Sequence, residues 1–128
     1  MKILYASILM MILLSSNVAA RTAKEALEAD CSIASDFILD GYIDASKGIS
    51  IENGINRTLE EATPKIDSKA KRTPLLDEAV RRIEIKLTQG HKLYVAAPKA
   101  GSDKVWSDTY RLCLDANKNG YLPNGTPK

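Results

Sequence analysis

The two cysteines of this chain, Cys31 and Cys113, constrain its fold more than any other feature. Each lies in a segment with the apolar spacing of a helix, one soon after a short apolar leader and one near the end of the chain. Because the leader indicates export and the chain has no second pair of metal ligands, a disulfide is favoured over a metal site. The bridge would stabilise the chain by about 4.5 kcal/mol in the loop-entropy treatment. Two buried free thiols are the alternative.

Residues 1–20 have the layout of a secretory signal peptide. Lys2 is followed by the apolar run Ile3–Leu14 and then by the small residues Val18-Ala19-Ala20. A membrane anchor is the alternative, but the run is shorter than the roughly 20 residues that span a bilayer. We predict cleavage after Ala20 and a soluble protein, not embedded in the membrane. The short signal with this ending is typical of bacteria, which indicates the periplasm.

Residues 21–128 are enough for one domain with a modest core. The formal net charge of +2 for the whole chain falls to +1 when Lys2 is removed, so no overall field favours nucleic acid or anionic lipid. The basic segment Lys65–Arg72 has no aromatic residue that could stack on a base. We therefore predict a single helical domain that does not bind nucleic acid.

The first half of the mature chain predicts two helices. The capping box of Thr22 and Glu25 begins the first, whose apolar residues recur every three or four positions until Gly48, a typical left-handed C-cap. Ser50 begins the second, which ends at Thr63-Pro64. We expect helices to about residue 46 and over residues 50–62.

The second half predicts two more helices. Thr73-Pro74 begins the third, and Gln89-Gly90 either ends it or kinks it, so residues 93–97 are either a last helical turn or extended. Ser102-Asp103 begins the fourth, and the tail from residue 121 is expected to be loose at its tip. The prediction is an all-α, four-helix up-and-down bundle closed by one disulfide between its first and last helices. The residues expected to face inward on the last helix are Val105, Trp106, Thr109, Leu112 and Cys113.

Three aspartates on the first helix are candidates for binding a partner. Asp36, Asp40 and Asp44 stand four residues apart, which places them in one ridge on the side away from Cys31. A solvated helix face explains this pattern. The functional interpretation is an anionic surface that meets a basic partner or a second copy of the protein.

The connection Pro98–Asp103 is predicted to be an exposed turn between the last two helices. Lys99, Ser102 and Asp103 are our candidates for contact with a protein partner, with the aspartate ridge beside them. Such a loop can enter the cleft of another protein while helix faces set the orientation.

Little in the sequence indicates catalysis or metal binding. His91 is the only histidine, and no zinc-binding or nucleophile motif surrounds it. Asp115, Asn117 and Asn119 match the first half of a calcium loop, but Thr126 stands where the closing acid belongs. The C-terminal cap of a helix explains the same residues, and weak calcium binding is the alternative. We predict no catalytic residue, no metal and no cofactor.

The layout resembles that of a known group of small periplasmic proteins. An early cysteine, here Cys31-Ser-Ile-Ala, and a closing Tyr110-Arg-Leu-Cys113-Leu-Asp115 flank a helical middle. This is similar to the all-helical immunity proteins of the Tai and Rap kind, although the charged connector Lys65–Arg72 departs from that pattern. The resemblance implies a partner that is a peptidoglycan-cleaving amidase toxin delivered by type VI secretion.

The expected function is therefore that of a periplasmic binding protein that blocks a toxic, cell-wall-degrading enzyme. The alternative is a structural or envelope-stress protein that self-associates, with the acidic ridge of one copy against the basic connector of another. An enzyme that uses His91 as a base is the third interpretation.

Overall fold

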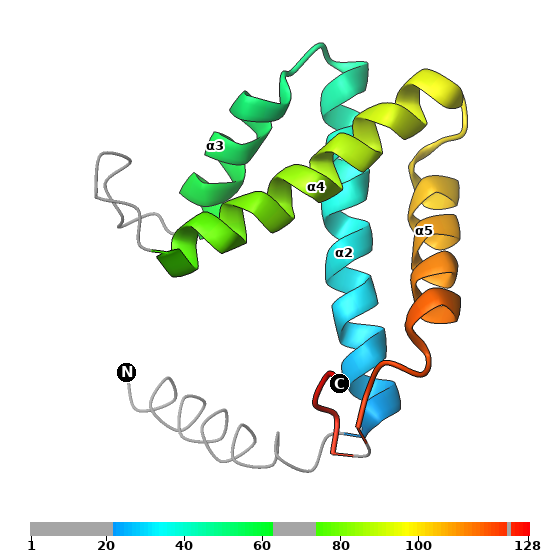
Figure 1. Ribbon diagram of the computed structural model, residues 1–128. Helices are drawn as coiled ribbons and strands as arrows, with labels where there is room; N and C mark the ends of the chain where they lie inside the picture. Colours follow the sequence, from blue (N-terminus) through cyan, green and yellow to red (C-terminus); the bar gives the residue numbers. More distant parts are fainter. Residues whose placement is uncertain (1–21, 63–73, 123) are drawn as a thin grey trace, which may run out of the picture. The chain divides into compact units, whose positions relative to one another are not determined.

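The computed structural model describes residues 22–62, 74–122 and 124–128. Within these ranges the chain forms no β-strand, and a single isolated β-bridge joins Tyr121 and Pro127. The all-α prediction is therefore confirmed. The predicted signal peptide and the connector Lys65–Arg72 lie outside the described residues. The helices, labelled in Figure 1, are α2 (Ala23–Ser46), α3 (Ile51–Ala62), α4 (Pro74–Ala96) and α5 (Ser102–Asn117).

The chain divides into two compact units. Within the described ranges, the first comprises residues 22–31 with Cys113–Lys128, and the second comprises Ser32–Leu112. None of the helices described here is long and apolar enough to cross a membrane.

The predicted starts of α2 and α3 and the predicted end of α2 are confirmed, whereas Thr63-Pro64, predicted to end α3, lies outside the described residues. Thr22 Oγ1 accepts a hydrogen bond from the amide of Glu25 at 3.1 Å, and Ser50 Oγ accepts one from the amide of Asn53 at 3.2 Å. Gly48 has a φ of 72°, the left-handed conformation expected after the end of α2. These ends agree with the prediction because capping depends on residues within one turn.

Gly90 does not end α4, which continues to Ala96, so residues 93–96 are helical. The glycine serves a close approach to α2 instead. A Cβ built on Gly90 would lie 2.5 Å from the backbone nitrogen of Tyr42, and one built on Gly41 would lie 2.7 Å from the Cα of Leu87. The two helix backbones therefore meet at a place where neither carries a side chain, where α4 crosses α2 in Figure 1.

The core of the Ser32–Leu112 unit lies between α3 and α4. Ile55, Val80 and Leu87 form a buried cluster, in which Leu87 has no exposed surface. On α5, Val105 is buried as predicted, but Leu112 is 66% exposed, so the prediction that it faces inward is wrong. The remaining hydrophobic residues packed against the cluster are Ile51, Leu59 and Ile83.

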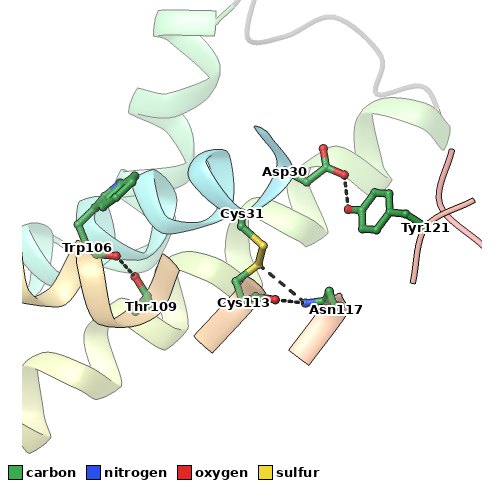
Figure 2. The surroundings of a disulfide bond; sticks show 7 residues. All are labelled: Asp30, Cys31, Trp106, Thr109, Cys113, Asn117 and Tyr121. Carbon is green, nitrogen blue, oxygen red and sulfur yellow. Dashed lines mark hydrogen bonds between the residues drawn. A yellow bond between two sulfur atoms is a disulfide. The ribbon is translucent and has the colours of Figure 1, made fainter. Parts of the chain in front are cut away.

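The other unit contains the predicted disulfide. Cys31 and Cys113 are bonded, with their Cα atoms 5.6 Å apart, and Cys31 is only 1% exposed. Figure 2 shows the Asn117 amide donating to the carbonyl of Cys113 at 2.9 Å and the Tyr121 hydroxyl donating to the carboxylate of Asp30. Burial, with help from this hydrogen bond, raises the pKa of Tyr121 to about 12.

The C-terminal tail is not loose, contrary to expectation. The amide of Leu122 donates to the carbonyl of Thr126, and the amide of Lys128 donates to the carbonyl of Gly120, both at 2.7 Å. Gly125, with a φ of 85°, supplies the left-handed residue that the turn requires. Backbone hydrogen bonds therefore join the described residues of the tail, which its proline- and glycine-rich composition alone does not indicate.

Candidate protein-binding surface

The loop between α4 and α5 has a defined turn. The amide of Ala97 continues the helical pattern by donating to the carbonyl of Leu93, and the amide of Ala100 closes a turn onto the carbonyl of Ala97 at 3.2 Å. Gly101 then adopts a φ of 84°, and its carbonyl accepts from the amide of Val105. Because side chains disfavour that conformation, Gly101 is the residue that reverses the chain into α5.

A buried tyrosine of α2 holds this loop in place. The hydroxyl of Tyr42, a residue only 5% exposed, donates to the carbonyl of Ala97 at 2.7 Å. The Tyr42 ring also packs edge-on against Tyr94, with the ring centroids 5.5 Å apart. Residues 55 apart in sequence thus fix the start of the loop to α2. The apolar spacing of the first predicted helix did not indicate this contact.

The three loop candidates are all at the surface. The side chains of Lys99, Ser102 and Asp103 are exposed. Asp103 lies in the first turn of α5, where an acidic side chain is favoured by the helix dipole. Their role in binding a partner stays a prediction.

The next turns of α5 carry a small charged network. Asp108 accepts from Lys104 at 2.9 Å and from Arg111 at 2.8 Å. The hydrogen bond from Lys104 is the main reason that the pKa of Asp108 lies below its usual value. Exposed pairs of this kind add little to the free energy of folding, so the network mainly sets the charge of this face.

Asp36 contacts α5 through Trp106. The indole nitrogen of Trp106 donates to Asp36 Oδ1 at 2.8 Å. The Trp106 ring stacks on that of Tyr110, with centroids 4.9 Å apart and planes 15° from parallel. A stacked aromatic pair therefore lies beside Asp36, one of the residues predicted to bind a partner. The sequence analysis missed this pair because it expected Trp106 to face inward. Aromatic side chains of this kind are enriched at protein interfaces.

Asp44 is not part of a solvated ridge. It is 2% exposed, and its carboxylate receives two hydrogen bonds from the guanidinium of Arg57, one of them at 2.9 Å. Gly54 makes room for it, since a Cβ there would lie 2.6 Å from Asp44 Oδ2. The expectation that all three aspartates face solvent is wrong for this residue.

Asp40 lies between these two environments and is half-buried. Burial raises the pKa of the Asp40 carboxyl, Arg57 opposes the rise, and Asp44 adds to it. Each four-residue step turns about 40° around a helix, so Asp36 and Asp44 end about 80° apart. That rotation lets one row of aspartates meet α5 at one end and α3 at the other.

The residues considered for chemistry are not brought together. His91 lines a hollow, and its Nε2 is buried with no hydrogen-bond partner within the described ranges. In the same ranges, no group of three or more histidine, cysteine, aspartate or glutamate side chains is arranged to hold a metal ion. The Asn117 amide, part of the partial calcium motif, is occupied by the carbonyl of Cys113.

Comparison of the chain with protein-family models, with curated proteins and with solved structures gave no significant match.

Proposed function

We propose that the mature chain is a periplasmic immunity protein that binds and blocks a toxic cell-wall-degrading enzyme. The partner in this proposal is a peptidoglycan amidase delivered by type VI secretion. The contact is made by the α4–α5 loop through Lys99, Ser102 and Asp103. The up-and-down order of the four helices is part of the same proposal.

The observation that carries the proposal is an exposed loop whose backbone is already ordered. Tyr42 holds the carbonyl of Ala97, and Gly101 fixes the reversal into α5. A loop that is ordered before binding loses less conformational entropy when it enters another protein. This supports a role as an inserting element.

The flank of the surface differs from the sequence-based expectation. Asp36 and Asp40 stay in the proposed surface, and the Trp106–Tyr110 pair joins them. Asp44 is left out, because its carboxylate is buried against Arg57.

The alternative is self-association through the acidic ridge. That arrangement needs a continuous anionic surface, and the burial of Asp44 removes one of its three charges. A dimer built on exposed charge pairs would dissociate as salt is added, because such pairs are screened within about 10 Å at 0.1 M.

The first experiment is a pull-down with the tagged, oxidised mature protein from the secreted and periplasmic fractions of its own culture. We expect one cell-wall hydrolase to be captured stoichiometrically and to lose activity. If only the protein itself returns, and does so in a salt-dependent manner, the self-association account replaces the proposal.

Loop variants then test the contact. Lys99→Glu reverses an exposed charge in the loop and is expected to weaken capture at least about tenfold. Arg81→Glu makes the same change at an exposed position of α4 outside the loop and serves as the matched control. If both variants lose capture equally, or if neither loses it, the loop is rejected as the contact.

A further inference from the structure

A hollow of about 690 Å³ lies where the end of α2, the turn into α3 and the last turns of α4 meet. This volume is within the range of about 300–1,000 Å³ typical of small-molecule sites. All of these segments belong to the Ser32–Leu112 unit. The apolar side chains that line the hollow are Ala45, Ile49, Ile51, Tyr94 and Val95.

Val95 makes the apolar wall accessible. It is 82% exposed, more than any other large hydrophobic residue identified as exposed in the described chain. A single exposed valine is ordinary on a protein surface. Here it stands beside a hollow whose other walls are also apolar, so an apolar ligand could cover it and the isoleucines together.

The lining of the hollow includes positive charge. Lys92 lines it with an exposed side chain, and Ser50 and Ile51 line it at the N-terminus of α3. Ser50 caps the amide of Asn53, whereas the amides of Ile51 and Glu52 precede the first acceptor inside the helix. The positive end of the α3 dipole and the Lys92 ammonium therefore both contribute positive charge to the lining of the hollow.

We propose that this hollow binds a single-chain amphiphile that carries a carboxylate. The chain lies on Ile49, Ile51 and Val95, and the carboxylate faces Lys92 and the N-terminus of α3. A neutral head group gains no charge attraction from these groups, and a cationic one is repelled by them. The site is separate from the α4–α5 loop contact and does not depend on the function proposed for that loop.

Three probes with the same chain length test the charge preference. Decanoate, decanol and decyltrimethylammonium are titrated, as monomers, into the oxidised mature protein. The ring signals of His91 report on the hollow, because His91 lines it and is the only histidine. The indole signal of Trp106, the only tryptophan and not a lining residue, is the internal reference.

We expect saturable shifts at His91 with little change at Trp106. Decanoate is expected to bind about three- to fivefold more tightly than decanol, the size of one exposed charge interaction. Decyltrimethylammonium is expected to bind more weakly than either. Absence of a His91 shift, or equal binding of all three probes, would overturn the proposal.

Two variants separate the head-group and chain contacts. Lys92→Ala is expected to reduce the preference for decanoate over decanol. Val95→Asn is expected to weaken the binding of both probes. Ile85→Asn changes a residue of the same helix that is 46% exposed and does not line the hollow, and it should leave both affinities unchanged. Equal weakening by Ile85→Asn and Val95→Asn would contradict the site. So would binding to phosphatidylglycerol vesicles without binding to decanoate, because the ligand would then be a membrane surface.

Discussion

Three aspartates of α2 each accept hydrogen bonds from a residue elsewhere in the sequence. Asp30 accepts from Tyr121, Asp36 from Trp106, and Asp44 from Arg57. Within each unit, these contacts tie a helix that is acidic on one side to the segments packed on it. A buried carboxylate is tolerated where a guanidinium satisfies it, as at Asp44.

Among the described residues, no side chain donates a hydrogen bond to Asp40, which gives a prediction with a defined pH dependence. Because burial raises the pKa of the folded-state carboxyl, its contribution to stability is fully present below the unfolded-state pKa, near 4, and is lost as the pH rises through the folded-state pKa. Asp40→Asn should therefore raise the free energy of unfolding at pH 7 by a few tenths to about 1 kcal/mol. Urea unfolding at pH 7 and at pH 3.5 measures the gain, which should shrink at the lower pH.

Glu84→Gln is the control for that change. It removes an exposed carboxylate from α4 and should give no comparable gain at pH 7. A destabilised Asp40→Asn protein at pH 7 would mean that attraction to Arg57 outweighs the loss of solvation.

At the scale of elements, the crossing of α2 and α4 depends on two glycines. Gly41 and Gly90 face the other helix's backbone at van der Waals distance, with no space for a methyl group. Glycine inside a helix normally costs about 1 kcal/mol relative to alanine. Both residues lie within helices, so the close contact must compensate for that cost.

Gly90→Ala is therefore expected to destabilise the protein although it raises helix propensity. Overpacking of this kind costs about 1–3 kcal/mol, which exceeds the propensity gain of about 1 kcal/mol. Urea unfolding followed by the far-ultraviolet circular dichroism of the helices shows whether Gly90→Ala lowers or raises the free energy of unfolding. Stabilisation by Gly90→Ala would show that the two helices separate easily, and would contradict the close crossing.

At the scale of the whole molecule, the disulfide closes a loop of 82 residues. Replacing both cysteines by alanine should lower the free energy of unfolding by about 4–5 kcal/mol in the loop-entropy treatment. For a chain of this length that is a large share of a typical net stability. Urea unfolding of the oxidised protein, the reduced protein and the Cys31→Ala/Cys113→Ala variant measures it.

The reductant should have no effect on the double variant, which makes it the control for nonspecific reduction effects. Equal stability of the oxidised and reduced proteins would show that the bond does not determine the fold. It would also weaken the idea that the cysteines frame the molecule.

Composition and local sequence patterns were enough to predict the helical class, the starts of α2 and α3 and the disulfide pairing. Thr22 and Ser50 mark helix starts because caps act through atoms about three residues away. The pairing followed because the chain has only two cysteines. Such features depend on composition and on neighbours in sequence.

Which residues each helix face contacts depends on tertiary packing. Gly90 has the sequence signature of a helix end, yet it lies inside α4 where that helix crosses α2. Asp44 has the sequence signature of a surface charge, yet its carboxylate is buried and hydrogen-bonded to Arg57. The Tyr42 contact that orders the candidate loop joins residues 55 positions apart. Periodicity shows which residues share a helix face. Which other residues pack against that face depends on the arrangement of all the helices, and therefore on the whole chain.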